Sequence, residues 1–488
     1  MLGKIFGKKK KSFYITTTLP YVNSDPHIGF AMEIIRADVI ARARILAGYD
    51  VFFNTGTDEH GAKIFAAAVA QGKDVQEYVD EYEKKFRGLK ELLGILDDIH
   101  FIRTTDPHHV AAAQEFWRRC DKNGYIYKKI YKMKYCVGCE LEKTDSELDE
   151  KGECPLHPGK PLELIDEENY FFKFSAFQKP LLDFYKKNPH FVLPEPRFNE
   201  IRAFVERGLE DFSISRLKSK MPWGIPVPGD ETQVMYVWFD ALVNYISTLG
   251  WPNDMKNFEK FWVKGTPMQY CGKDNLRQQA AMWQAMLMAA GLPNSHTIVV
   301  NGFLTGSGGI KMSKSLGNVV DPYYVVDLYG TDALRLFLLK DISLYEDSPF
   351  TVERLKEAYN ASLANGLGNL VSRILTLSEK YLDKTPELPE WRDMPGYFHR
   401  LEKYDIKQSV DEIWKEIADL DKYMQTTEPY KVAKIDPEKG KQMISEMVVR
   451  LFTIARMLKP LLPETGTKIK DLVCANKKPT APLFARKE

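Results

Sequence analysis

The sequence predicts an α/β fold: a Rossmann-like parallel sheet that is split by a metal-binding insertion and followed by an α-helical bundle. Three observations support this. Apolar, β-branched runs alternate with helical patterns over roughly the first 120 residues, which is typical of a parallel sheet. A cluster of cysteines with one histidine interrupts that alternation. Beyond Thr351 only helical periodicity remains.

The composition is that of an ordinary globular protein. A chain of 488 residues exceeds the size at which one core stops growing, so several domains are expected. Lys plus Arg number 68 and Asp plus Glu 67, so no overall basic field indicates nucleic acid. No run of about 18 apolar residues indicates a membrane span. Three of the six cysteines are clustered with a histidine, which favours a metal site in a reducing compartment over disulfides.

Residues 13–29 read as strand, turn and helix start. A β-branched run ends at Pro20 and Pro26, and a helical apolar pattern follows. His27 lies at the start of that helix. In a parallel sheet, ligands lie beyond the carboxyl ends of strands, where the next helix offers free N–H groups to a phosphate. A histidine at this place is also a common helix cap, so the pattern alone leaves both readings open.

A second strand from Asp50 leads to Asp58, a carboxylate at a strand's carboxyl end that is suited to a cation such as an ammonium group. An Asx turn cap explains Asp58 equally well. The spacing of Gly56 and Gly61 is similar to a Walker A loop. That motif requires a lysine where Ala62 stands, so it is excluded.

The insertion contains a strong metal-site signal. Cys136 and Cys139 form one knuckle, and Cys154 and His157 form a second after fourteen residues. Three thiolates and an imidazole match tetrahedral zinc with every position filled, which is typical of a structural ion. We therefore predict one structural Zn²⁺ per chain.

The second half of the sheet is predicted from two further strands. Residues 233–238 read as an apolar strand that runs into a helix, and residues 268–272 read as another. Both are expected to end at the sheet edge that holds His27. Trp238 is a candidate ligand contact, although a tryptophan at a strand end commonly packs in the core. A glycine-rich loop then delivers Lys311 and Lys314, whose ammonium groups can follow negative charge that develops on a bound ligand.

The remainder is predicted to be helical. Amphipathic helices are expected over residues 352–381, 406–424, 437–458 and 465–473, which form a bundle in the simplest arrangement. The sequence thus divides into five segments. They are a basic extension (1–12), the first half of the sheet domain (13–124), a connective insertion with the zinc knuckle (125–222), the second half of the sheet domain (223–350) and the helical domain (351–488).

Two motifs far apart in the chain resemble the paired signatures of class I aminoacyl-tRNA synthetases. The first is the His27 to Gly29 segment, and the second is the lysine–serine run from Lys311 to Ser315. From about residue 13 to residue 473 the chain resembles the methionyl-tRNA synthetase family with a Cys3His knuckle. Further motifs that carry the resemblance are Leu19 to Tyr21, Gly56 to Gly61, Val237 to Ala241, Gly272 to Asp274, and Asn369 with Arg373.

The resemblance implies a two-step reaction. ATP, with Mg²⁺, activates L-methionine to an adenylate with release of pyrophosphate. The acyl group then passes to the terminal adenosine of tRNA(Met), both elongator and initiator. The family's helical domain binds the anticodon, which makes residues 351–488 an anticodon-binding domain. Because the chain ends without room for an appended dimerisation domain, a cytoplasmic monomer without membrane contact is expected.

The resemblance also assigns roles residue by residue. Catalysis falls to His27, Lys311 and Lys314, and ATP binding to His27, Gly29, Phe30, Gly272, Asp274 and Lys314. Methionine binding falls to Leu19, Tyr21, Asp58, Trp238, Ala241, Leu242, Tyr245 and Gln279, with Asp58 holding the ammonium group. Anticodon binding falls to Asn369, Arg373, Pro429 and Tyr430. The zinc ligands are Cys136, Cys139, Cys154 and His157.

Three positions depart from the family's pattern. Phe30 stands where a second histidine is usual, which removes a polar group near the phosphates. Gln279 replaces a histidine of the methionine pocket and can still donate and accept. Tyr430 replaces an anticodon tryptophan and keeps a face for stacking. We expect Phe30→His to be tolerated.

Three alternatives remain from the sequence alone. A synthetase-like chain with weakened catalysis that only holds tRNA is supported by Phe30. A class I synthetase for another amino acid is opposed by the short insertion, which has no room for an editing domain, and by the placement of the metal cluster. A nucleotidyltransferase with the first signature leaves the helical domain unexplained.

Overall fold

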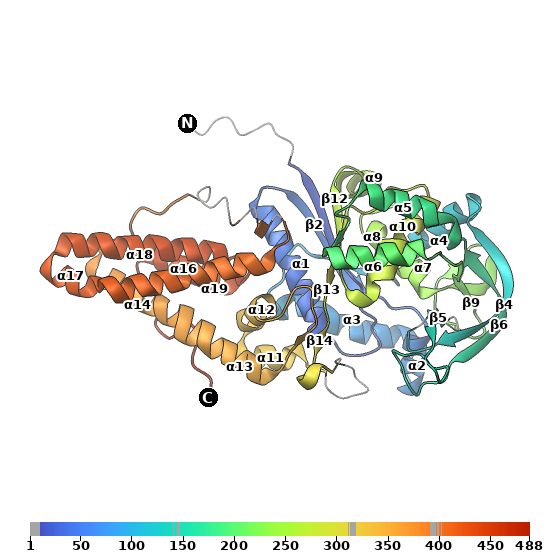
Figure 1. Ribbon diagram of the computed structural model, residues 1–488, viewed down its shortest axis with the longest axis horizontal. Coiled ribbons are helices and arrows are strands. Elements are labelled where there is room, and N and C mark those ends of the chain that lie inside the picture. The colour runs from blue at the N-terminus through green and yellow to red at the C-terminus, as the bar shows by residue number, and fades with distance from the viewer. Residues whose placement is uncertain are drawn as a thin grey trace.

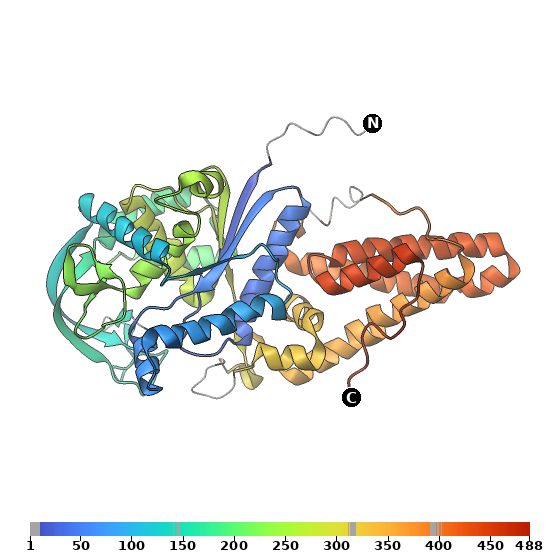
Figure 2. The same ribbon diagram turned by 180° about the vertical axis from the view of Figure 1, so that it is seen from behind.

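The structure, a computed structural model, describes residues 10–139, 141–143, 147–310, 312, 319–390, 397, 400, 401 and 403–488. Figures 1 and 2 show a wide body that contains the sheets and a long helical bundle that projects from one side of it. Among the described residues, no helix is both long enough and apolar enough to cross a bilayer.

Six parallel strands form the central sheet, in the order β3-β2-β1-β12-β13-β7. In β1, Phe13 and Ile15 enter one hydrophobic core and Tyr14 enters the other. Burial on both faces explains why this strand reads as an unbroken apolar run. The strands are β1 (Ser12–Thr17), β2 (Asp50–Thr57), β3 (His100–Arg103), β7 (Val192–Leu193), β12 (Thr266–Gly272) and β13 (Thr297–Asn301).

Helices cover both faces of the sheet, as the sequence pattern predicts (Figure 1). One core gathers side chains of α1, α3 and α12, and the other gathers side chains of α4 and α10. The helices of this body are α1 (Ile28–Leu46), α2 (Ala62–Ala70), α3 (Val75–Leu92), α4 (Pro107–Lys122), α7 (Val237–Ala241), α8 (Asn244–Ser247), α9 (Met255–Asn257), α10 (Trp283–Ala289), α11 (Pro322–Tyr329) and α12 (Thr331–Lys340).

The expectation that residues 233–238 form a strand of the central sheet is wrong. That segment contributes to β11 (Asp230–Met235), which lies between β9 (Ser215–Leu217) and β10 (Pro226–Val227) in a separate antiparallel sheet. The first half of β11 is exposed or partly exposed and only its second half is buried, which suits a small sheet at the edge of the body. The helix that follows, α7, begins at Val237 and carries Trp238.

The insertion folds around a four-stranded antiparallel sheet, in the order β5-β4-β6-β8. Among the described residues near the knuckle, Tyr135 and Phe171 form a small buried apolar cluster, so the knuckle itself has little core. Its elements are β4 (Ile126–Cys136), β5 (Leu141–Lys143), β6 (Glu163–Phe172), α5 (Gln178–Lys187), α6 (Glu195–Glu206) and β8 (Phe212–Ser213).

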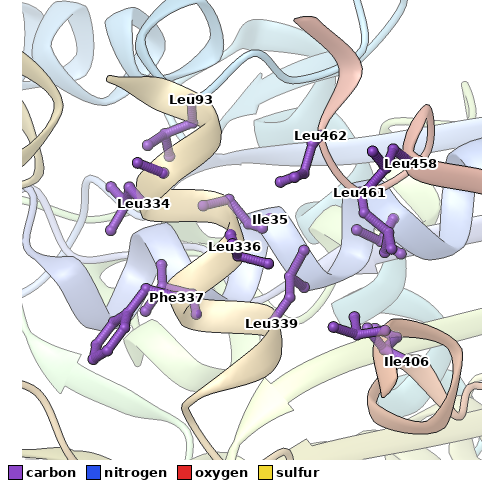
Figure 3. Close-up of a cluster of buried hydrophobic side chains, with 14 of the residues drawn as sticks. Ile35, Leu93, Leu334, Leu336, Phe337, Leu339, Ile406, Leu458, Leu461 and Leu462 are labelled. Atoms are coloured by element: carbon purple, nitrogen blue, oxygen red, sulfur yellow. The ribbon is translucent and has the colours of Figure 1, made fainter. Parts of the chain in front are cut away.

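The C-terminal bundle joins the sheet body through α12. Figure 3 shows Leu336 and Leu339 of α12 beside Ile35 of α1, with Leu461 of the bundle in the same buried cluster. The predicted helix over 352–381 is continuous but contains a π-helical segment, Tyr359–Gly368. The bundle consists of α13 (Val352–Ala358), α14 (Asn369–Tyr381), α16 (Ile406–Thr427), α17 (Pro429–Ile435), α18 (Pro437–Leu458) and α19 (Pro463–Ala475).

Candidate functional site

One cavity lies beyond the carboxyl ends of β1 and β12, the neighbouring strands from which the chain winds in opposite directions. Such a switch point is where parallel α/β sheets bind ligands. The cavity has a volume of about 410 Å³. Every predicted methionine- or ATP-binding residue within the described ranges lines it: Leu19, Tyr21, His27, Gly29, Phe30, Asp58, Trp238, Ala241, Leu242, Tyr245, Gly272, Asp274 and Gln279.

His27 is the N-cap of α1 and faces this cavity. The Gly29 N–H donates to Nδ1 of His27 over 3.1 Å, so the neutral ring carries its proton on Nε2. A Cβ at Gly29 would lie 3.0 Å from the imidazole, which explains the glycine. The arrangement combines a ring donor with a helix N-terminus, and this combination favours an anion.

Phe30 packs edge-on against Phe86 of α3, with ring centroids 5.7 Å apart, and is 9% exposed. An apolar contact therefore occupies the wall where the family usually has a second imidazole. The cavity still reaches Phe30, so the departure leaves the nucleotide side of the cavity open.

Backbone bonds hold the loop after β1 against the end of β2. The Asp58 N–H donates to the Pro20 carbonyl over 3.0 Å, and the Val22 N–H donates to the Asp58 carbonyl over 3.2 Å. Tyr21 and Asp58 therefore pair as an isolated parallel bridge. This pairing brings the carboxylate predicted to hold an ammonium group next to the predicted apolar slot.

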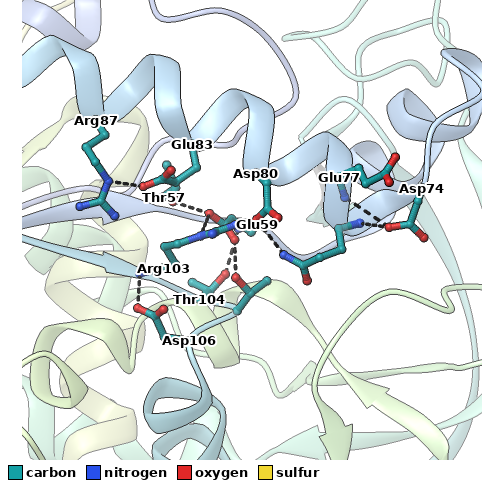
Figure 4. A network of polar contacts seen from close by, with 12 residues as sticks. Thr57, Glu59, Asp74, Glu77, Asp80, Glu83, Arg87, Arg103, Thr104 and Asp106 are labelled. Atoms are coloured by element: carbon teal, nitrogen blue, oxygen red, sulfur yellow. Dashed lines mark hydrogen bonds and ion pairs between the residues drawn. The ribbon is translucent and has the colours of Figure 1, made fainter.

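The buried Glu59, next to Asp58 in the chain, holds this loop in place. Glu59 accepts hydrogen bonds from Arg103 Nε over 2.8 Å and from Thr57 Oγ1 over 2.6 Å (Figure 4). Its carbonyl also accepts from the Trp223 indole over 2.6 Å. Because Glu59 is 0% exposed and bonded on several sides, the loop has little freedom to move.

Asp240 ties α7 to the same loop. Its Oδ2 lies 2.9 Å from Nδ1 of His60, and its Oδ1 lies 3.3 Å from Nε2 of His109. Burial would raise the pKa of Asp240, but the two imidazoles outweigh that effect and lower the pKa below its ordinary value. Trp238, two residues earlier in α7, is only partly buried and opens on the cavity instead of being sealed in the core.

Glu33 is a cavity residue that the sequence patterns did not single out. It is 6% exposed, and its Oε1 accepts from the Thr18 N–H over 2.8 Å and from the Thr18 hydroxyl. Burial raises its pKa to about 8, although the bonds from Thr18 oppose the shift. A carboxylate inside the apolar helix pattern of residues 28–46 is the signal that could have identified it.

Gly272 ends β12, and Asp274 follows in the next turn. A Cβ at Gly272 would lie 2.7 Å from Oδ1 of Asp274, so only glycine leaves that carboxylate in place. The Lys273 ammonium pairs with Asp347 at 2.7 Å, and this ion pair stabilises the turn that contains Asp274.

Lys311 and Lys314 lie outside the described residues. The chain before them, at Phe303 and Leu304, lines the cavity. The chain after them returns to the first turn of α1, where the Ile28 N–H donates to the Val320 carbonyl over 3.0 Å. The convergence of His27 with Lys314 therefore stays a prediction.

The four predicted metal ligands converge. Their ligand atoms all lie within 4.8 Å of one another, and Sγ of Cys139 is 3.4 Å from Sγ of Cys154. Ligands of tetrahedral zinc with bonds near 2.3 Å lie about 3.8 Å apart, so the cluster could hold a metal ion. A Cβ at Gly138 would lie 2.4 Å from the His157 ring, which explains that glycine.

The knuckle touches the cavity. Cys139 lines it, as does Lys63 of α2. The Lys63 ammonium donates to the Gly138 carbonyl over 2.9 Å and lies 5.8 Å from the centre of the Tyr21 ring. Lys63 thus connects the metal cluster to the apolar slot, a link that no local sequence pattern indicates.

The predicted anticodon residues lie on two parts of the bundle. Asn369 and Arg373 occupy the first turns of α14, and Arg373 pairs with Asp421 of α16 at 2.8 Å. Pro429 and Tyr430 begin α17, and Tyr430 is 37% exposed. Within the described ranges, no hydrogen bond or ion pair joins the two groups directly.

Comparison with known proteins gives a consistent result. A family model described as "tRNA synthetases class I (M)" matches residues 13–161 and 156–375. Methionine–tRNA ligase of Thermotoga maritima is 40% identical over 96% of this chain and 76% of its own length. The corresponding protein of Rickettsia felis is 38% identical over 96% of this chain and 93% of its own.

Solved structures agree with the sequence relatives. Mycobacterium tuberculosis methionyl-tRNA synthetase in complex with methionyl-adenylate superimposes with a TM-score of 0.88 at 36% identity, over 95% of this chain and 94% of that one. The apo form of the same protein gives a TM-score of 0.83 at 31% identity, over 98% and 99% of the two chains.

Proposed function

Because the chain belongs to the methionine–tRNA ligase family of class I aminoacyl-tRNA synthetases, we propose a role in the family's reaction for each group of its site residues. The enzyme activates L-methionine with ATP to methionyl-adenylate and pyrophosphate, and then transfers the methionyl group to tRNA. The convergence of the family's motif residues on one cavity carries the assignment of the active site.

Methionine occupies the part of the cavity between the loop after β1 and helix α7. Its ammonium group pairs with Asp58, and its side chain packs on Trp238 and Tyr245. Leu19, Tyr21, Ala241, Leu242 and Gln279 complete the slot. Apolar contact alone separates side chains that differ by one methylene by only about 1–3 kcal/mol, so the polar atoms of Tyr245 and Gln279 must add selectivity.

ATP occupies the side of the cavity at the start of α1. The Nε2–H of His27 donates to the triphosphate, while Gly29 leaves room for it beside the helix N-terminus. Phe30 supplies apolar contact, and Gly272 and Asp274 receive the ribose. Lys311 and Lys314 neutralise the leaving pyrophosphate. Mg²⁺ bound with ATP would share that neutralisation.

No protein nucleophile is needed in this reaction. The methionine carboxylate attacks the α-phosphate, and the cavity contributes position and charge. Asp58 and Trp238 fix the amino acid at one end, and His27 fixes the triphosphate at the other.

Zinc is the metal proposed for Cys136, Cys139, Cys154 and His157, because three thiolates and one imidazole with no open position suit a structural zinc ion. These four residues would hold one Zn²⁺ per chain, which would cross-link a knuckle whose described part has few buried apolar side chains.

Transfer of methionine requires tRNA(Met), elongator and initiator, and we assign its anticodon to the helical domain. The exposed Tyr430 ring can stack on a splayed base, worth about 1–3 kcal/mol. Asn369 and Arg373 can bond base edges. The five segments, bounded at residues 12, 124, 222 and 350, then comprise an extension, two halves of the catalytic domain separated by the insertion, and an RNA-binding domain. We expect the protein to be a cytoplasmic monomer.

Pyrophosphate exchange across a panel of amino acids tests the proposal. Exchange that depends on methionine and exceeds that with leucine, valine or cysteine supports it. Exchange with another amino acid would assign a different specificity. Binding of tRNA(Met) without exchange would favour the weakened synthetase that Phe30 suggested.

A further inference from the structure

A chain of five buried polar side chains runs from the cavity wall into the body behind it. None of them is more than 5% exposed, so each hydrogen bond is made within the protein. The members, in spatial order from the cavity, are Tyr245, Gln279, Gln269, Ser295 and Gln284.

The backbone fixes the orientation of the last member. The Ser295 N–H, which can only donate, lies 3.1 Å from Oε1 of Gln284. The Gln279 carbonyl, which can only accept, lies 2.9 Å from Nε2 of Gln284. Two independent backbone groups therefore agree on which end of the Gln284 amide is nitrogen.

That orientation propagates toward the cavity. Gln284 Nε2 donates to Ser295 Oγ over 3.1 Å, and the Ser295 hydroxyl in turn donates to Oε1 of Gln269. The other end of the Gln269 amide donates to Oε1 of Gln279, whose Nε2 donates to the Tyr245 oxygen. Each member before Tyr245 therefore donates forward. If the Gln269 amide were turned over, the Ser295 hydroxyl would accept from both amides, and its own proton would have no acceptor among the described residues.

Tyr245 is the end of the chain and lines the cavity. Burial raises the pKa of its phenol, so the proton stays on the oxygen at working pH. The oxygen already accepts from Gln279, and the hydroxyl donates to no group in the described part of the protein. Its O–H is therefore directed to whatever occupies the cavity.

We propose that Gln269 and Ser295 are positioning residues, which fix the direction of this chain so that the Tyr245 hydroxyl donates to the side chain of bound methionine. The inference rests on the proposed function, in which this cavity holds methionine. A thioether sulfur is a weak acceptor and never a donor. A methylene in its place accepts nothing, so the chain selects sulfur over an isosteric hydrocarbon such as norleucine.

Gln269→Met tests the direction. A thioether keeps the length of the side chain but cannot donate to Gln279, so the Gln279 amide can turn over, and Tyr245 then donates to Gln279 instead of to the substrate. The ratio of kcat/KM for methionine to that for norleucine in pyrophosphate exchange is expected to fall about three- to tenfold, through the KM for methionine. The value for norleucine should change little.

Two substitutions at Ser295 distinguish a positioning role from a packing role. Ser295→Ala breaks the chain and should lower the same ratio, whereas Ser295→Thr keeps a hydroxyl and should restore it. Ser409→Ala is the matched control, because it removes a fully buried serine hydroxyl from α16, remote from the cavity. Its ratio should equal that of the parent protein.

Equal losses for both amino acids in Gln269→Met and Ser295→Ala would overturn the proposal and leave the proposed function intact. If Gln269→Met does not fold, the two Ser295 variants decide by the same ratio. Failure of the unaltered protein to use methionine at all would instead overturn the proposed function.

Discussion

At the residue scale, His27 performs two tasks with two different atoms. Nδ1 caps α1 by accepting from the Gly29 N–H, and the proposed function assigns Nε2–H to the triphosphate. His27→Asn should separate the tasks, because asparagine is a good N-cap but its amide does not reach as far as Nε2. We expect a free energy of unfolding within about 0.5 kcal/mol of the parent and an activation rate about 100-fold lower.

Thermal melts and methionine-dependent pyrophosphate exchange measure the two effects. Gln at the same position is the counterpart, because its amide nitrogen approaches Nε2 and its side chain caps poorly. Full exchange activity in His27→Asn would show that Nε2 contributes nothing.

Glu33 should make stability depend on pH. Its pKa is about 8 in the folded protein, against 4.5 for an ordinary glutamate, so folding favours the protonated carboxyl. The resulting stability is complete below about pH 4.5 and is lost as pH rises through about 8. Glu33→Gln should remove this loss, which amounts to a slope of at most about 1.4 kcal/mol per pH unit.

Urea unfolding of both proteins between pH 5 and about pH 8 measures the difference. Parallel stability profiles would show that Glu33 ionises normally inside the fold.

His27 and Asp58 could be predicted from the local sequence because each follows a strand that the pattern reveals, whereas the family resemblance supplied most of the other cavity residues. Glu33 and Lys63 could not. The pKa of Glu33 depends on its burial and on its hydrogen bonds from Thr18. The position of Lys63 depends on its hydrogen bond to the Gly138 carbonyl of the knuckle. Neither neighbour is near in sequence.

At the scale of elements, Asp240 holds α7 in place through His60 and His109. Asp240→Asn removes the charge that these imidazoles share. Because α7 carries Trp238, the KM for methionine should rise about tenfold while the KM for ATP changes little. Asp254→Asn, at an exposed aspartate that caps α9, is the control. Equal increases in both KM values would indicate general disorder of the cavity.

The knuckle should depend on its ligands more than on its packing. Cys154→Ser removes a fully buried ligand, and we expect loss of the bound metal, proteolysis within residues 125–172 and a higher KM, since Cys139 lines the cavity. Cys474→Ser, at an exposed cysteine outside the cluster, should change none of these. Metal content, limited proteolysis and pyrophosphate-exchange kinetics of the two variants measure these effects. Unaltered metal content in Cys154→Ser would contradict the ligand assignment.

The wrong placement of β11 shows where element prediction stops. An apolar run before a helix is equally typical of a sheet strand and of a short strand in a side sheet, and only the pairing partners distinguish them. The two-residue β7, which comes from the insertion yet forms one edge of the central sheet, is too short for any periodicity to reveal.

At the scale of the whole molecule, Arg335 joins the sheet body to the bundle. The side chain is fully buried and donates to Asp38 Oδ2 over 2.7 Å and to the Leu461 carbonyl over 2.7 Å. Arg335→Met should lower the free energy of unfolding by about 3–5 kcal/mol, because it leaves a buried carboxylate with less compensation. Asp38 keeps Arg42 as a second partner, at 2.7 Å.

Adding Asp38→Asn to Arg335→Met should cost less than the sum of the two single changes, which denaturant titrations can measure. Simple additivity would show that the pair is not coupled.

Under the proposed function, the extended outline in Figures 1 and 2 sets a length requirement on the tRNA. Helix α17 lies at the end of the bundle remote from the sheet, while the cavity lies in the opposite half of the molecule. An RNA hairpin that binds only at α17 would not place a terminus in the cavity for acylation. A short acceptor fragment would place a terminus there but would make no contact with α17. Under the proposed function, only an RNA folded to the right length can contact α17 and place its end in the cavity at the same time.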